Sequence, residues 1–209
     1  MEKRMPKRRG LLEMAVVVMC LFLLPAIALA GPQDQIRQMV DSVIGIVQDK
    51  AIGDKAKEDR IASLVKERFD FDGMARRALG KNWRKADSGQ REKFTGLFTD
   101  LLETTYSGRI INYSGERVKY TRERIRGNRA IIDTFIVSGN KDIPVIYRMV
   151  KSSGGWFVVD VVIEEVSLIR NFRDTYSEII ANEGFTGLFD RMARKIKELK
   201  NSSDGGVAQ

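Results

Sequence analysis

The chain has 209 residues, of which 31% are charged, and a formal net charge of +8. It contains no histidine and a single cysteine, Cys20. These absences exclude Ser-His-Asp and Cys-His catalysis, a histidine general base and imidazole-based metal sites. Any chemistry would have to come from carboxylates, tyrosine, lysine, serine or threonine.

The first thirty residues predict an export signal. An apolar run from Met14 to Leu24 follows a basic segment and precedes the small-x-small sequence Ala28-Leu29-Ala30. The run is shorter than the roughly twenty residues that a permanent membrane anchor needs. We therefore expect cleavage after Ala30 and an exported mature protein that has no thiol. The basic segment consists of Lys3, Arg4, Lys7, Arg8 and Arg9.

The remainder is long enough for one domain with a single core. We expect this domain to span residues 31–200 and residues 201–209, which are rich in small and polar side chains, to be a disordered tail. The mature chain is mildly basic. In an exported protein this charge favours a solvated surface or anionic head groups over nucleic acid as a partner.

Apolar residues at a spacing of 3.6 predict four helices before any strand. The first covers residues 33–50, the second continues through Ile61 to Phe69, and a short third one runs from Phe71 to Leu79 and stops near Gly80. Asp87 with Gln90 three residues later predicts the N-cap of a long fourth helix that reaches Ile110.

From Glu116 the apolar period changes to two, and three turns divide the segment into four hairpin-connected strands. A two-residue Gly139-Asn140 turn would pair Ser138 with Lys141, and a loop over 151–155 would pair Val150 with Trp156. This register makes one sheet face apolar. The polar face would then carry Asp133, Asp142, Arg148, Trp156, Asp160 and Glu164.

Two more helices follow, over residues 166–180 and 185–199. The fold class is therefore α+β, with helices covering one face of a curved four-stranded antiparallel sheet. A small sheet needs fewer helices than these to close a core. The surplus apolar surface predicts a helical annex or a lined cavity.

Several catalytic patterns fail on inspection. Ser63 and Lys66 match the Ser-x-x-Lys of penicillin-binding enzymes, but the companion motifs are absent and Ser63 lies on an amphipathic helix. Glu164 and Glu165 are adjacent on a predicted strand, so they would point to opposite faces and could not act as a pair. Asp160 would lie diagonally from Arg148 on the outer face, which favours a structural ion pair. No phosphate-binding loop or cluster of metal ligands is present in the sequence.

Several motifs together resemble the MlaC family, also called the toluene-tolerance family, of periplasmic phospholipid-binding proteins, over about residues 33–199. Glu165 departs from the pattern, since the family usually has glycine before the Val-Ser pair. The motifs are Phe69-Asp70-Phe71, Leu79-Gly80-x-x-Trp83, Gln90-Arg91-x-x-Phe94, Phe98, Leu101-Leu102, Thr105-Tyr106, Tyr147-Arg148, Trp156-x-Val158-x-Asp160 and Val166-Ser167-Leu168.

The resemblance implies an NTF2-like sheet and helices enclosing a pocket for the acyl chains of a phospholipid, which would be cargo rather than a cofactor. It also implies a carrier that works in the periplasm between an outer-membrane lipoprotein–porin complex and an inner-membrane ABC transporter with MCE domains. The apolar sheet face and the phenylalanine-bearing helices would form the pocket, although the same pattern alone is typical of a packed core. The candidate lipid-binding residues are Phe94, Phe98, Leu101, Val145, Tyr147, Met149, Val159, Val161, Ile169 and Phe172.

Two other interpretations stay open at this point. The first is a small exported isomerase or hydrolase of the same fold using Tyr and Asp, which would need a carboxylate on the inner face. The second is a structural periplasmic adaptor with a filled core. A basic patch of Lys81, Arg84 and Lys85 around Trp83 is a candidate docking surface for a carrier, or simply a solvated surface.

Overall fold

The computed structural model describes residues 30–111, 117–139 and 141–205. The expected export signal, apart from Ala30, and the last four residues of the expected tail lie outside the described residues. Cleavage after Ala30 therefore stays a prediction, which the intact mass of the exported protein would check.

Among the described residues five helical segments precede the sheet. They are α2 (Pro32–Gln48), α3 (Asp54–Arg68), α4 (Phe71–Leu79), the 3₁₀-helix η1 (Gly80–Arg84) and α5 (Ser88–Ile111). Side-chain caps mark the start of two of them, α4 and α5. The Asp70 carboxylate accepts a hydrogen bond from Gly73 N at 2.8 Å and caps α4. Asp87 and Gln90 exchange side-chain-to-backbone hydrogen bonds of 3.1 and 2.8 Å. This capping box confirms the predicted start of α5.

The sheet is antiparallel and its strands follow chain order. It consists of β1 (Arg117–Arg126), β2 (Arg129–Ser138), β3 (Lys141–Ser152), β4 (Gly155–Ile163) and β5 (Val166–Ser167). The α+β prediction is confirmed, but the number of strands was one too low. Val166 and Ser167, expected to begin a helix, pair with Ile163 and Val162 instead.

The two predicted hairpin registers had different outcomes. Ser138 pairs with Lys141 and Thr134 with Val145, as the two-residue turn predicts. In the next hairpin Lys151 pairs with Trp156, so the predicted Val150–Trp156 register was wrong.

A bulge causes a further shift in that hairpin, since Met149 pairs with Val158 but Arg148 pairs with Asp160. On the hairpin side of the bulge, the Lys151–Trp156 register brings Trp156 and Val158, rather than Phe157 and Val159, into the buried cluster on the inner face.

The turn between β4 and β5 is conformationally unusual. Glu164 and Glu165 both have positive φ, 48° and 69°, and are the only non-glycine residues with positive φ in the described ranges. They connect Ile163 to its partner Val166, so they form a two-residue hairpin turn of the kind that favours Asn-Gly. The expectation that both glutamates lie on a strand was wrong. Glu165, where the chain departs from the MlaC sequence pattern, thus has a backbone conformation that favours glycine.

We expect Glu165→Gly to stabilise the fold by about 1 kcal/mol, because it removes the clash between Cβ and backbone in the left-handed region. The free energy of unfolding in urea measures this effect. Glu178→Gly, within the regular part of a helix, is the matched control and should destabilise by about 1 kcal/mol. Equal destabilisation by both substitutions would contradict the assigned turn.

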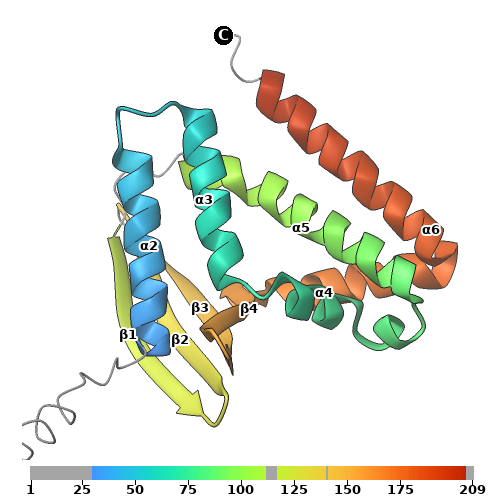
Figure 1. Cartoon of the computed structure of the whole chain (residues 1–209), viewed down its shortest axis with the longest axis horizontal. Helices are drawn as coiled ribbons and strands as arrows, with labels where there is room; N and C mark the ends of the chain where they lie inside the picture. The colour runs from blue at the N-terminus through green and yellow to red at the C-terminus, as the bar shows by residue number, and fades with distance from the viewer. Residues whose placement is uncertain (1–29, 112–116, 140, 206–209) are drawn as a thin grey trace, which may run out of the picture.

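The last helix, α6 (Leu168–Gly205), is two helices joined at Gly184, whose φ of 69° and ψ of −172° interrupt the helical backbone. This break confirms the predicted boundary between the two C-terminal helices. Residues 201–205, expected to belong to the tail, continue the helix. Figure 1 shows α5 and the two arms of α6 extending away from the sheet, while α2 lies across the sheet.

Buried apolar side chains form two clusters in the described structure. One joins α4, α5 and α6 around Phe94, Phe98 and Leu188. The other joins α2 to the sheet around Ile36, Ile132 and Met149. Phe69, between α3 and α4, packs against both. The expected helical annex thus has its own core, separate from the core beneath the sheet.

Asp160 connects the sheet to this annex. Its carboxylate accepts hydrogen bonds from Arg148 Nη1 at 3.0 Å, from Ser167 Oγ at 2.7 Å and from Ile169 N at 3.1 Å. The predicted ion pair with Arg148 is confirmed. The bond to Ile169 N also satisfies a free amide in the first turn of α6.

Candidate functional site

The inner face of the sheet is an apolar surface covered mainly by α2. Val145, Tyr147 and Met149 alternate along β3 and therefore share this face. Near the β3–β4 hairpin the face is fully packed, since Met149 and Val158 contact Ile36 of α2 in one buried cluster. Gln35 Oε1 fixes α2 there by accepting a hydrogen bond from Trp156 N at 2.9 Å.

Burial is less complete toward the opposite end of the same face, although Val145 there is only 3% exposed. Tyr147, Val161 and Tyr120 pack against the sheet cluster but are only half-buried, as are Ile136 and Ile143 nearer the strand ends. The helices continue past this end: Figure 1 shows α2 and α3 extending beyond the strands. The C-terminal half of α2 and the turn after it carry more half-buried aliphatic residues, namely Val43, Ile44, Ile46, Val47 and Ile52.

Two tyrosine hydroxyls lie within this apolar region. The buried Tyr120 hydroxyl has no hydrogen-bond partner among the described residues, and the Arg37 guanidinium stacks 4.2 Å from the centre of its ring. Burial raises the pKa of Tyr147 to about 12. Burial, with smaller contributions from Tyr147 and Asp41, also raises the pKa of Tyr120. Both phenols are therefore protonated hydrogen-bond donors at neutral pH.

These shifts predict an alkaline loss of stability. A buried phenol whose pKa is raised above the unfolded value of about 10 stabilises the fold fully below pH 10. That contribution is lost as pH rises toward 12, at about 1.4 kcal/mol per pH unit for each tyrosine. We expect Tyr147→Phe to lessen the fall in unfolding free energy between pH 10 and 11.5. A spectrophotometric pH titration of the phenols checks the assignment, because the Tyr147→Phe variant should lack one of the tyrosines that ionise late in the wild-type protein.

Nine of the ten candidate lipid-binding residues fall into two groups. Tyr147, Met149 and Val161 belong to the sheet cluster, and Val145 is buried beside them on the same strand face. Val159 lies at the bulge in β4 and is buried outside both clusters. The other five lie in or against the helical cluster and are Phe94, Phe98, Leu101, Ile169 and Phe172.

The aromatic residues of this second group fill the helical core. Phe94 and Phe98 are fully buried and stack at 5.6 Å, and Phe172 meets Phe98 edge-on at 5.3 Å. Tyr176 closes the group, 5.6 Å from Phe94. The apolar side chains of this group therefore pack in a cluster separate from the sheet residues; Phe69 packs against both clusters, and Ile169 N donates a hydrogen bond to Asp160 of β4.

Sequence reasoning missed the contributions of α2 and β1 to the inner face. Ile36, Met39 and Val40 form the helix stripe that covers it, and Tyr120 adds a hydroxyl. The stripe itself was visible in the sequence as a 3.6-residue period. What the period did not reveal was which sheet face it covers.

Carboxylates on the sheet are engaged away from the two tyrosines. Asp133 accepts two hydrogen bonds from Arg124, at 2.8 and 2.9 Å, and Asp160 is paired with Arg148. Glu123 pairs with Ile132 and so faces α2, where its Oε1 accepts a hydrogen bond from Gln33 N at 3.0 Å. The described part of the inner sheet face thus offers the two tyrosine hydroxyls as donors together with apolar contacts, while Glu123 is engaged at the N-terminal end of α2.

Other chemical readings find no support in the described ranges. Ser63 Oγ donates to the Asp59 carbonyl oxygen at 2.9 Å, and Lys66 pairs with Glu103 at 2.9 Å, so this serine and lysine serve helix contacts. No grouping of His, Cys, Asp or Glu among the described residues could hold a metal ion. No described helix has both the length and the apolar character that crossing a bilayer requires.

Comparisons with known proteins agree on one family. The family described as "MlaC protein" matches residues 37–194. A Haemophilus influenzae protein named intermembrane phospholipid transport system binding protein MlaC is 23% identical over 183 residues, covering 83% of this chain and 86% of the relative. A phospholipid-binding protein from Ralstonia solanacearum, solved in complex with a phospholipid, is 22% identical with a TM-score of 0.74. That match covers 82% of this chain and 99% of the Ralstonia chain.

Proposed function

The chain belongs to the MlaC family, and we propose that it is a periplasmic carrier that moves phospholipid between the outer membrane and an inner-membrane MCE/ABC transporter. The observation that carries the proposal is the incompletely buried apolar face beneath α2, with its two protonated tyrosine hydroxyls. The names of the Haemophilus and Ralstonia relatives support phospholipid as the cargo.

In this proposal the acyl chains lie between the half-buried end of the sheet face and the α2–α3 pair. Val145, Tyr147 and Val161 would contact the chains from the sheet. The hydroxyls of Tyr120 and Tyr147 would donate hydrogen bonds to ester oxygens of the lipid. For Tyr120 this bond removes the cost of a buried donor that has no partner among the described residues. The head group would stay in solvent.

The energetics favour a carrier that needs a docked partner. Burying roughly thirty methylenes at about 0.8 kcal/mol each gives a gross term near 24 kcal/mol, above the ceiling of about 18–21 kcal/mol for real complexes. A membrane offers nearly the same burial, so exchange with a membrane costs little while release into water is very slow. Such a protein performs no bond chemistry, and we propose no catalytic residue.

Organic-solvent extraction and mass spectrometry of protein purified from a periplasm test the proposal. We expect phospholipid at close to one molecule per protein, bound without detergent. A control purified in parallel, the same protein unfolded in urea and refolded without lipid, should contain none. Folded periplasmic protein that carries no lipid would overturn the carrier function.

A further inference from the structure

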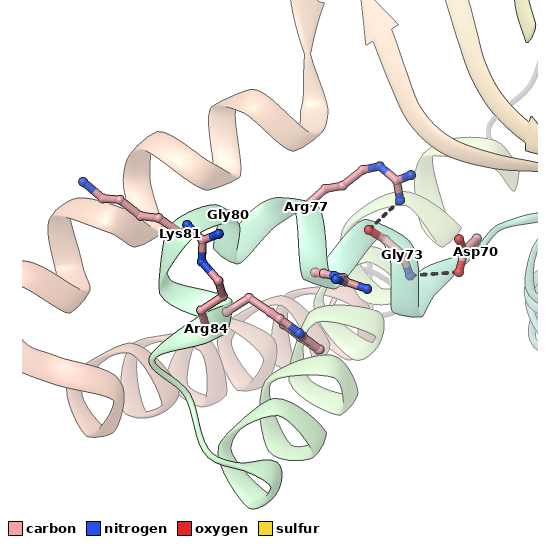
Figure 2. Close-up of a pocket in the computed structure, with 8 residues that line it drawn as sticks. Asp70, Gly73, Arg77, Gly80, Lys81 and Arg84 are labelled. Carbon is pink, nitrogen blue, oxygen red and sulfur yellow. Dashed lines mark hydrogen bonds between the residues drawn. The ribbon is translucent and has the colours of Figure 1, made fainter. Parts of the chain in front are cut away.

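A basic hollow of about 660 Å³ lies on the outer side of the α4–η1 segment. Figure 2 shows Arg77, Lys81 and Arg84 projecting from this segment, with Asp70 at its start. The residues that line the hollow are Asp70, Gly73, Arg76, Arg77, Gly80, Lys81, Trp83 and Arg84. The structure thus adds Arg76 and Arg77 to the basic patch expected from the sequence and leaves Lys85 out of the lining.

The cations of this hollow have no acidic partners within the described ranges. None of the ion pairs between described residues involves the four cations of the lining, which are Arg76, Arg77, Lys81 and Arg84. The cations that do pair with a carboxylate are Lys55, Lys66, Lys119, Arg124, Arg148, Arg191 and Lys195. The lining contains one carboxylate, Asp70, and its Oδ1 already caps α4 through Gly73 N. The hollow is therefore lined by four cations and a single carboxylate, and none of the four cations forms an ion pair within the described ranges.

Several hydrogen bonds hold the walls of the hollow, and one of them uses a lining cation, since Arg77 Nη1 donates to the Gly73 carbonyl oxygen at 2.9 Å (Figure 2). Arg173 of α6 donates from Nε to the Arg77 carbonyl oxygen at 2.8 Å and packs against Gly80, whose φ is +54°. Arg91 Nε donates to the Trp83 carbonyl oxygen at 3.0 Å, and Trp83 packs against the helical core. A preorganised site loses little entropy when a ligand binds.

We propose that this hollow docks an acidic segment of a partner protein. Carboxylates of the segment would meet Arg76 and Arg84, because guanidinium groups pair with carboxylates through two parallel hydrogen bonds. An apolar side chain of the segment would lie against Trp83. The concave shape favours a protruding peptide, which can enter the hollow, over a flat membrane surface, whose phosphates would contact only its rim. The inference rests on the proposed carrier function for its purpose, since a carrier must dock before its lipid moves.

The test measures binding of a fluorescein-labelled octapeptide of Glu, Asp and Leu by anisotropy, using the full mature protein. We expect Arg76→Glu with Arg84→Glu to weaken binding by about tenfold at low salt and by less at high salt, as screening predicts. The matched control, Arg194→Glu with Lys197→Glu, makes the same change in net charge on exposed residues of α6. It should change binding by less than about twofold.

Three outcomes would overturn the docking site. Equal weakening by both double variants would indicate unspecific charge attraction, and no weakening by either would exclude the hollow. Loss of binding to vesicles of phosphatidylglycerol, with peptide binding intact, would assign the hollow to a membrane surface instead. Lipid content, measured by extraction of the same samples, separates this result from the carrier function, because the Arg76 and Arg84 variants should retain their lipid.

Discussion

Replacing Val145 with glutamate is expected to remove co-purified phospholipid almost completely. Val145 is 3% exposed on the inner sheet face, and a carboxylate there would have to displace apolar contacts and shed its hydration, at a cost of several kcal/mol. Val161→Glu, at a half-buried position paired with Tyr147, should lower bound lipid by about tenfold with less damage to the fold. Quantitative mass spectrometry of extracts, beside circular dichroism of the same samples, measures both effects.

Val166→Glu is the matched control, because it makes the same substitution at a residue that is 60% exposed on β5. This variant should keep its lipid. If Val166→Glu and Val161→Glu retained equal amounts while both stayed folded, the lipid would have to lie elsewhere, and the helical core around Phe94 and Phe98 would be the next place to test.

The two hairpins show which parts of the register can be predicted from sequence. The Gly139-Asn140 turn fixes its hairpin locally, because a two-residue turn needs positive φ and Gly139 supplies it with φ of 56°. In the β3–β4 hairpin the outcome depends on a bulge beside Arg148, which no local signal marks. Trp156, assigned to the polar face by the alternation, turns inward where Gln35 of α2 binds its amide.

The strand β5 was missed because its determinants are equally indirect. Val166 and Ser167 are too short a segment for a detectable period, and Val166 fits the spacing of the following helix. Their pairing depends on the turn at Glu164 and Glu165, and glutamate is unfavourable at these two positions because both have positive φ. Asp160 supports the pairing from the adjacent strand through Ser167 Oγ.

Only the part of the candidate site that lies on a single strand could be predicted from the sequence. Alternation along β3 identified Val145, Tyr147 and Met149, since period two is a property of one strand. The choice of Phe94, Phe98 and Phe172 as their partners required knowing which apolar stripes meet. In the structure these rings meet Tyr176 and one another, and α2 covers the sheet.

Asp160→Ala is expected to destabilise the fold by about 3 kcal/mol, which corresponds to a fall of about 10 °C in Tm. Asp160 is 5% exposed, and its removal leaves Ser167 Oγ and Ile169 N without their acceptor. The Arg148 side chain is 45% exposed, so water can hydrate its guanidinium in the variant, which limits the loss of stability. Urea unfolding at pH 7 gives the free energy directly.

Asp142→Ala is the matched control for this prediction, since Asp142 also lies on a strand and pairs with a cation. Its side chain is 52% exposed and its distance to Lys119 is 3.6 Å, so the expected cost is below about 0.5 kcal/mol. A similar cost for both substitutions would mean that Asp160 does not connect β4 to α6. If the expected difference is found, one buried carboxylate stabilises the junction between the sheet, whose inner face is proposed to hold the lipid, and the first turn of α6.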